Sequence, residues 1–315
     1  MSLMPLLPLS PVPSPAVAKL TALAVLGQCT NCEAELPDPT PNFCPACGQE
    51  TQIKPPSVGE FLQQFSGTYF ASEGALWRTF KLLLSQPGEL TAQYLNGRRK
   101  QYVLPLRLFL SMTVVMLLSM RLVGALQMSA LDDPELAAAL AERPNEIALE
   151  LGVVRAGMAG GVFFCEGMPD WVCRRVQAKI DTSTRKLMEQ VQKVNDRIAS
   201  NAGVVMFVLL PAFAGMLALL FRQRGFSYTE HLVFALHLHA FWFGTIAFMM
   251  LALEWMPGLA LLGLLVIPAY AALAFRRVYG GPPGPLVWRC AVLSLVHLTL
   301  VICMVALTAL AALLL

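Results

Sequence analysis

Four cysteines near the N-terminus have the residue types and spacing of a metal site. They form two CxxC pairs within CTNCEAELPDPTPNFCPACGQ, residues 29–49. Each pair predicts a tight turn that offers two thiolates, and the connecting loop brings the pairs together as a tetrahedron. Because four thiolates leave no coordination position for water, we expect one structural Zn²⁺ and no catalysis by it. The predicted ligands are Cys29, Cys32, Cys44 and Cys47.

Two other chemistries of cysteine pairs compete with zinc. Two disulfides would need an oxidising compartment. A redox role would use one CxxC at the start of a helix in a thioredoxin-like setting. The membrane orientation predicted from the distribution of positive charge favours zinc, because it puts the cysteines in the cytoplasm, where thiols stay reduced. Gly48, directly after the last cysteine, suits a turn that directs backbone N–H groups toward sulfur.

The histidines are the second group with possible chemistry. Three of the four histidines lie in one apolar segment, and the fourth lies in the last apolar segment. Ionisable residues inside a membrane are costly, so a functional role is their default interpretation. If these two segments touch, His297 could meet His237 or His239 and form a proton relay, a metal site or a haem site. The possible polar site comprises Glu230, His231, His237, His239 and His297.

A structural role is the alternative for these residues. On a helix with about 100° per residue, His237 and His239 point in nearly opposite directions, so they cannot bind one metal ion together. Neutral imidazoles can instead pack and form hydrogen bonds between helices. A helix cap explains Glu230 and His231 equally well. The pattern favours the structural interpretation and leaves the functional one open.

Basic residues and a second pair of cysteines complete the candidate sites. The stretch NGRRKQYVLPLR places four cations beside the first long apolar segment, where they predict contact with anionic lipid headgroups. These cations are Arg98, Arg99, Lys100 and Arg107. The same charges also follow the positive-inside rule, which needs no special function. Cys165 and Cys173, in CEGMPDWVC, permit a disulfide in an oxidising compartment, and two free thiols are equally compatible.

A membrane framework must position these groups. The chain is 56% hydrophobic and 14% charged, whereas soluble proteins have about 25% charged residues. The net charge of +3 gives no case for nucleic-acid binding, which needs a basic face on a soluble domain. We therefore predict an all-α polytopic membrane protein with about five transmembrane helices and a small N-terminal zinc ribbon that uses four cysteines. The apolar segments are 103–127, 202–221, 231–252, 258–275 and 288–312.

The distribution of positive charge predicts the orientation. Basic residues precede the first span and also lie between the second and third spans and between the fourth and fifth spans. The turn between the third and fourth spans, residues 254–258, has no cation. With five spans, the basic clusters all fall on one side. We therefore expect a multi-pass protein of the bacterial inner membrane with a cytoplasmic N-terminus and a periplasmic C-terminus.

The predicted organisation follows from these spans. It comprises a Pro-rich leader (1–27), the cytoplasmic ribbon (28–50), juxtamembrane amphipathic helices (51–102), the first span (103–127), a helical external segment (128–201) and a four-span bundle (202–315). In the external segment, Asp133 and Pro134 suit the start of a helix. An apolar stripe over 170–200 predicts a long amphipathic helix that runs into the second span. Residues 151–164 could dip into the membrane, although Arg155 argues against another span.

The motifs resemble a known bacterial family. CTNC and FCPACGQ, then TFKLLLSQPGELTAQYLNGRRKQYVLPLRLFL, then YTEHLVFALHLHAF are similar to membrane proteins of domain-of-unknown-function family 3667. The resemblance covers residues 29–120 and 225–243, and its most specific part is the Pro-Gly…Tyr-Leu…Gly-Arg-Arg-Lys…Pro stretch. It implies that the four ribbon cysteines bind zinc. It implies no activity, because the family is uncharacterised.

The sequence holds no nucleophile triad, phosphate loop or dinucleotide fingerprint. We therefore expect a non-enzymatic protein whose ribbon contacts a protein partner, or a second copy of the chain, in a scaffolding, assembly or regulatory role. Membrane lipids are further expected partners, and nucleic acid is not. The alternative is a transporter or membrane enzyme that uses the His/Glu cluster to handle protons, metal or haem.

Overall fold

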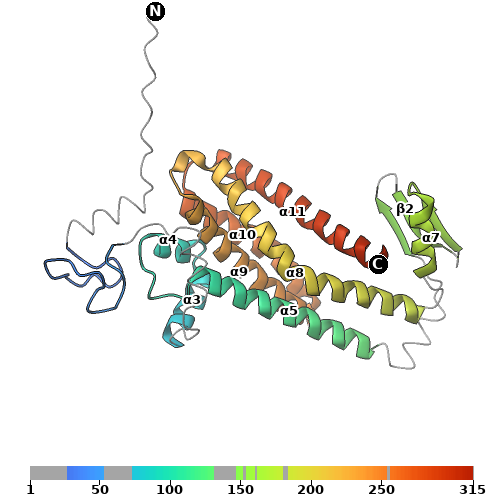
Figure 1. Ribbon diagram of the computed structural model, residues 1–315, viewed down its shortest axis with the longest axis horizontal. Helices are drawn as coiled ribbons and strands as arrows, with labels where there is room; N and C mark the ends of the chain where they lie inside the picture. Colours follow the sequence, from blue (N-terminus) through green and yellow to red (C-terminus); the bar gives the residue numbers. More distant parts are fainter. Residues whose placement is uncertain are drawn as a thin grey trace, which may run out of the picture. The chain divides into compact units, whose positions relative to one another are not determined.

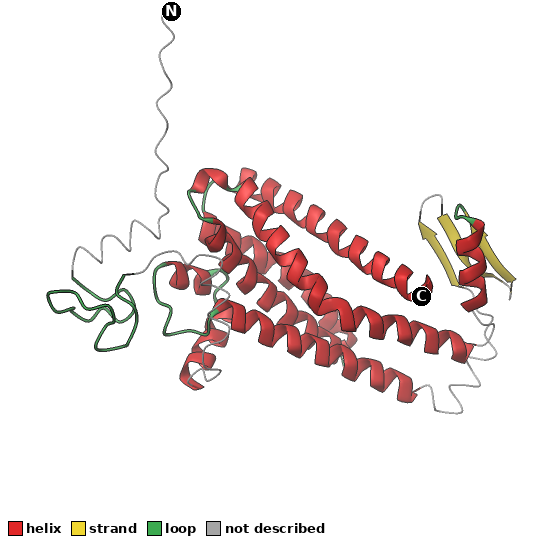
Figure 2. Ribbon diagram, in the orientation of Figure 1, coloured by secondary structure: helices red, strands yellow, loops and turns green. Residues whose placement is uncertain are grey.

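The fold is described from a computed structural model, which covers residues 27–52, 73–130, 147–151, 154–159, 162–179, 184–253 and 256–314. Helices predominate in these ranges, and the named strands lie between residues 147 and 166 (Figure 2). The chain divides into two compact units, which we describe separately. Unit 1 comprises Met1–Val115 and Leu209–His297, and unit 2 comprises Met116–Val208 and Leu298–Leu315.

Some predicted segments lie outside the described residues. They are the leader up to residue 26, residues 53–72 of the juxtamembrane region, and the helix expected to start at Asp133 and Pro134.

Unit 1 contains the ribbon, two short helices and most of the long helices (Figure 1). Its helices are α3 (Glu73–Ser85), α4 (Glu89–Leu95), the start of α5 (Pro105–Ala130), the end of α8 (Thr184–Leu220), α9 (Tyr228–Leu253), α10 (Pro257–Tyr279) and the start of α11 (Pro283–Leu314). A proline begins α5, α10 and α11. The fixed φ and missing N–H of proline suit the first turn of a helix, where that N–H would have no partner.

Helix α9 forms the core of unit 1. Every residue from Thr229 to Phe241 is buried, as expected for a helix that is apolar on all sides. Helix α10 packs along α9, and the rings of Phe241 and Tyr270 stack with centroids 3.4 Å apart. The residues with possible chemistry on α9 therefore face neighbouring helices.

The turn between α3 and α4 packs directly on α10. Gly88 has φ 77°, and a Cβ at this position would lie 2.9 Å from the carbonyl oxygen of Ala274. Arg277 donates a 3.0 Å hydrogen bond to the carbonyl oxygen of Pro87. Glycine is required here because the backbone is left-handed and a side chain would collide with α10. This turn therefore joins the juxtamembrane helices to the bundle.

Three helices are long and apolar enough to cross a membrane. They are Pro105–Leu126 of α5, Tyr228–Leu253 of α9 and Pro283–Thr308 of α11. Helix α8 carries a shorter apolar stretch, Phe207–Leu220. These lengths indicate a multi-pass membrane protein.

Unit 2 corrects the prediction of a helical external segment and of an all-α fold. Strands β1 (Ile147–Leu151), β2 (Val154–Ala159) and β3 (Val162–Glu166) form an antiparallel sheet in the order β1-β2-β3. Residues 151–164, considered as a possible membrane dip, belong largely to this sheet. Such short apolar runs do not separate strand from helix by periodicity, which is why the prediction was wrong.

Opposite charges face one another across the sheet. Arg155 on β2 lies opposite Glu150 on β1 and opposite Glu166 on β3. Its guanidinium lies 3.7 Å from the Glu166 carboxylate, and opposite charges across strands stabilise the pairing modestly. The residue that argued against a membrane span thus has acidic neighbours on both sides.

Helices follow the sheet. The amphipathic helix predicted over 170–200 is present as α7 (Asp170–Lys179) and as α8, which continues to Leu220 with Pro211 inside it. Most side chains of the predicted stripe lie outside the described residues. Cys165, on β3, and Cys173, on α7, form a disulfide, so the structure chooses the disulfide over two free thiols.

Candidate metal centre and histidine contacts

The four ribbon cysteines converge on one point. Their sulfur atoms all lie within 4.8 Å of one another, and the Cys29–Cys47 and Cys32–Cys44 sulfur pairs are each 3.7 Å apart. A disulfide bond is about 2.05 Å long, so these pairs are free thiols. Four thiolates at about 2.3 Å from a tetrahedral metal ion lie about 3.8 Å apart. The cluster therefore fits a tetrahedral ion such as Zn²⁺.

The two CxxC pairs form matching turns. The N–H of Glu33 donates a 2.8 Å hydrogen bond to the carbonyl oxygen of Cys29, and the N–H of Gly48 does the same to Cys44. Glu33 and Gly48 both have left-handed backbones, with φ 62° and 69°. This confirms the turn predicted at Gly48 and adds an equivalent turn at Glu33. The two pairs thereby present their sulfurs in the same way.

Backbone N–H groups stabilise the thiolate of Cys44. Burial alone raises the pKa of this thiol, but hydrogen bonds from the N–H groups of Cys47 and Ala46, together with those from the thiols of Cys29 and Cys32, outweigh burial and lower the pKa to about 7. A metal ion binds thiolates, so this turn prepares one ligand for binding. Burial raises the pKa of the Cys29 thiol, because removal from water disfavours the charged thiolate.

Gln49 fastens the ribbon to the loop that precedes α5. Its side chain is 3% exposed and uses both ends of its amide. The Nε2 group donates to Thr30 Oγ1 at 3.1 Å and to the carbonyl oxygen of Gly97 at 2.6 Å. The Oε1 atom accepts hydrogen bonds from the backbone N–H groups of Arg99 and Lys100 at 3.2 and 3.3 Å. A single buried amide thus satisfies three backbone groups of the NGRRK loop.

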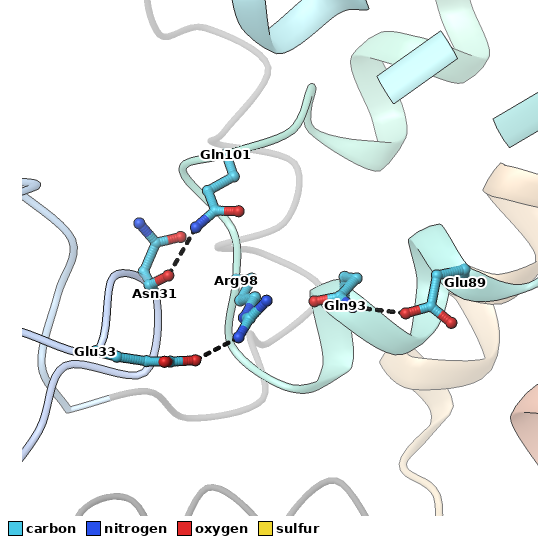
Figure 3. A network of polar contacts seen from close by, with 6 residues as sticks. All are labelled: Asn31, Glu33, Glu89, Gln93, Arg98 and Gln101. Carbon is cyan, nitrogen blue, oxygen red and sulfur yellow. Dashed lines mark hydrogen bonds and ion pairs between the residues drawn. The ribbon is translucent and has the colours of Figure 1, made fainter. Parts of the chain in front are cut away.

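Two further contacts join the ribbon to the NGRRK loop and the residue after it (Figure 3). The Arg98 guanidinium forms an ion pair with the Glu33 carboxylate, and Gln101 Nε2 donates a 2.8 Å hydrogen bond to the carbonyl oxygen of Asn31. Glu33 adopts a left-handed backbone conformation, which normally favours glycine. Its contact with Arg98 gives a physical reason for a non-glycine residue there.

These contacts bear on the predicted lipid site. Arg98 is paired with Glu33, and the Arg99 guanidinium lies 5.0 Å from the centroid of the Tyr94 ring. Both side chains therefore have partners within the protein. Lipid contact stays a prediction for this group of four cations, of which Lys100 is exposed.

His237 joins α9 to α4. Its Nδ1 atom lies 2.9 Å from Thr91 Oγ1, and the Tyr94 ring lies edge-on to the imidazole with centroids 6.4 Å apart. Both hydrogen-bonding side chains are buried. The contact holds an amphipathic juxtamembrane helix on the core helix, as interhelical hydrogen bonds of neutral imidazoles do.

The helices and the loop that make these contacts lie in a region that matches a protein-family model. Residues 73–117 match the model of DUF3667, a protein family of unknown function. The match runs from the start of α3 into α5, so it includes the Gly88 turn, Thr91 and the NGRRK loop. It confirms the family resemblance inferred from the sequence. Neither the comparison with curated proteins nor the comparison with solved structures gives a match.

Outside the DUF3667 match, Glu230 and His231 lie at the start of α9. The Glu230 carboxylate accepts hydrogen bonds from the backbone N–H and the hydroxyl of Ser227, at 2.7 and 3.0 Å. This is the capping role predicted as the alternative for Glu230. His231 Nδ1 lies 2.8 Å from the Tyr279 hydroxyl on α10. Within the described part of the chain, the contacts of these two side chains are with Ser227, Phe226 and Tyr279 and do not include the other histidines.

His239 and His297 meet. Their ring centroids are 5.2 Å apart with planes at 84°, and the Phe213 ring of α8 lies 5.0 and 4.9 Å from them. His239 Nδ1 donates a 2.8 Å hydrogen bond to the carbonyl oxygen of Ala235, so its Nε2 carries the free lone pair. Of the two contacts considered for His297, the structure selects His239.

Polar atoms without hydrogen-bond partners gather around the His239–His297 contact. His239 Nε2, His297 Nδ1 and Trp242 Nε1 are buried without a hydrogen-bond partner in the part of the chain that is described. The Trp242 ring centroid lies 4.8 Å from that of His239 and 6.0 Å from that of His297.

Trp242 and Gln49 are residues that the sequence patterns did not single out. The signal for Gln49 is a polar residue directly after the last cysteine turn, and Trp242 lies three residues after His239, on its face of the helix.

Proposed function

We propose that this chain is a five-span protein of the bacterial inner membrane whose cytoplasmic zinc ribbon mediates protein contact in a scaffolding, assembly or regulatory role. The observation that carries the proposal is the Gln49 contact, because it fixes the ribbon to the loop that leads into α5. A ribbon held in this way presents a defined outer surface to a partner. The proposal assigns no chemistry to the metal.

Zinc supplies the folding energy of the ribbon. A segment of this size buries too little apolar surface to fold alone, and a closed site of four thiolates provides the missing free energy. The fit of the sulfur positions to a tetrahedron supports Zn²⁺ as the ion. Cys29, Cys32, Cys44 and Cys47 would hold it.

Two features support the five-span topology. Counting α8, with its apolar stretch Phe207–Leu220, and α10 as further crossings brings the three candidate spans to five, and this count would put the basic clusters on one side. It also places the ribbon thiols in a reducing compartment and the Cys165–Cys173 disulfide in an oxidising one.

An exposed aromatic ring marks the surface offered to a partner. Phe43 directly precedes the second cysteine pair, and its side chain is 58% exposed. Phenylalanine side chains are more often buried inside a protein. Exposed aromatic side chains are enriched at protein interfaces. We therefore assign Phe43 as the centre of the contact, either with another protein or with a second copy of the ribbon.

A matched pair of variants tests this assignment. Full-length protein carrying Phe43→Ala or the neighbouring control Asn42→Ala is cross-linked in membranes, and zinc content and cross-linked partners are measured. Phe43→Ala should lose the partner, or the dimer, with zinc retained, and Asn42→Ala should lose neither. Chelation that unfolds the ribbon should remove the same partner while leaving the membrane helices folded. An identical set of cross-links in wild type and both variants would overturn the proposal.

A second candidate function rests on the His239–His297 pair. Three buried polar atoms without partners among the described residues favour proton handling between α9 and α11, because imidazoles can relay protons through water. Proton flux is measured in liposomes that contain the purified protein. His297→Phe should reduce flux, and His231→Phe, which removes the Tyr279 contact, should not. Equal flux in wild type and His297→Phe would rule this candidate out.

A further inference from the structure

A polar pocket lies where α8 meets α9 and where α10 meets α11. The cavity has a volume of about 340 Å³, near the lower end of the range of about 300–1,000 Å³ for small-molecule sites. The two connections lie together at one end of the helices of unit 1 (Figure 1). The lining includes Gln223, Arg224, Gly280, Pro282, Leu286 and Arg289.

Two arginines make this pocket cationic. Arg224 and Arg289 are both half-buried, and among the described residues no carboxylate forms an ion pair with either one. Arg224 donates a 3.3 Å hydrogen bond to the carbonyl oxygen of Gly280, and the Arg289 guanidinium lies 5.3 Å from the Phe221 ring centroid. Glu230, the acidic residue at the start of α9, accepts hydrogen bonds from Ser227 and forms no ion pair with either arginine in the described residues. The charge of the pocket is therefore not neutralised by these neighbours.

The Arg224 guanidinium lies directly against Gly281. Gly281 has φ 99°, and a Cβ built on it would overlap the terminal nitrogen of Arg224. A side chain at this position would be strained by the left-handed backbone and would require the guanidinium to shift. The absence of a side chain at Gly281 thus leaves room for Arg224 in its observed position.

The pocket lies at the ends of apolar helices, where the headgroups of a surrounding bilayer would be expected. Span-length helices α9 and α11 begin next to it, at Tyr228 and Pro283, and the apolar stretch of α8 ends at Leu220. Trp288 precedes Arg289 and is 70% exposed. Tryptophan side chains concentrate at membrane interfaces, where the ring is in the acyl region and the N–H reaches water.

We propose that this pocket binds the phosphate of an anionic phospholipid headgroup. Arg224 and Arg289 contact the phosphate oxygens with their guanidinium N–H groups, and the lipid chains continue along the exposed apolar face of α11. Arginine presents a planar fork that matches phosphate oxygens. A lipid is favoured over a free phosphate because the ends of the apolar helices border the pocket and the exposed Trp288 directly precedes the lining residue Arg289. The proposal is independent of the ribbon's role.

Lipid binding is measured on the full-length protein in detergent by native mass spectrometry, with titration of phosphatidylglycerol and of phosphatidylcholine. Arg224→Gln and Arg289→Gln should each weaken phosphatidylglycerol binding at least about tenfold, as expected for a lost charge-assisted hydrogen bond. The control is Arg222→Gln. Arg222 is exposed and belongs, with Arg224, to the short 3-10 helix η1 (Arg222–Arg224), but it does not line the pocket. Its effect should not exceed about fivefold, the loss of one non-specific surface cation.

Further variants separate the outcomes. Arg289→Lys keeps the charge and removes the fork, so it should weaken binding and leave the fold intact, as judged by a single peak in size exclusion. Equal losses in all three glutamine variants would show a diffuse surface effect and overturn the proposal. Equal affinity for both lipids would overturn it as well. Competition by inorganic phosphate at the lipid's own concentration would identify a free-anion site and reject the lipid assignment.

Discussion

The side-chain amide of Gln49 donates a 2.6 Å hydrogen bond to the carbonyl oxygen of Gly97, 48 residues further along the chain. This bond joins the metal ribbon to the loop between α4 and α5. The same side chain accepts hydrogen bonds from the backbone N–H groups of Arg99 and Lys100, so one buried amide makes three of the contacts that position the ribbon.

Replacing this amide should release the ribbon without unfolding it. Gln49→Ala removes three hydrogen bonds to the loop and should weaken ribbon docking by about 2–4 kcal/mol. Hydrogen exchange at residues 97–101 should rise, while zinc content stays unchanged. The control Gln93→Ala removes a bond to Glu89 within α4, worth about 0.5 kcal/mol or less. Equal exchange in both variants would contradict the assigned role.

The zinc prediction concerns stoichiometry. Purified wild-type protein should contain one zinc ion per chain, because four thiolates lie at tetrahedral spacing. Cys44→Ser should lose most of this zinc, since a hydroxyl is a poor zinc ligand, and metal analysis after dialysis measures the loss. Cys303→Ser, at an exposed free cysteine on α11, should retain it. A second metal ion in the wild type would instead support chemistry at the histidines.

Gly88→Ala should destabilise the protein by about 2–4 kcal/mol, because the added methyl group meets the Ala274 backbone at 2.9 Å and the left-handed φ of 77° adds strain. Gly215→Ala, in α8, meets nothing within 4 Å and should be neutral or slightly stabilising. Thermal unfolding in detergent compares the two variants. A midpoint for Gly88→Ala at or above that of the wild type would show that the turn does not approach α10 so closely.

Thr91→Val tests the contact between α4 and α9. The substitution keeps the shape of the side chain but leaves His237 Nδ1 without its 2.9 Å partner, which should cost about 1–3 kcal/mol. The control Thr113→Val removes only a hydrogen bond to the carbonyl oxygen of Phe109 within α5. Its effect on the unfolding midpoint should be smaller. If both valines shift the midpoint equally, His237 has no special role in holding α4.

Local features were predictable from the sequence. The ribbon depends on ligand types and short spacings, and its turn at Gly48 follows from the same pattern. Long apolar runs predict helices, and three of them are candidate spans. The sheet at β1–β3 was missed because its strands have five or six residues each, too few for periodicity to distinguish them from helix.

The sequence by itself determined that the chain carries a four-cysteine cluster suited to a metal ion, is mostly helical and matches DUF3667. The tertiary structure alone decided which polar residues meet across the bundle. His239 rather than His237 meets His297, and Gln49 holds the NGRRK loop. Composition and spacing specify an element and the face a residue occupies. Which face packs against which neighbour depends on side-chain fit between distant helices, and that fit appears only once the helices are packed.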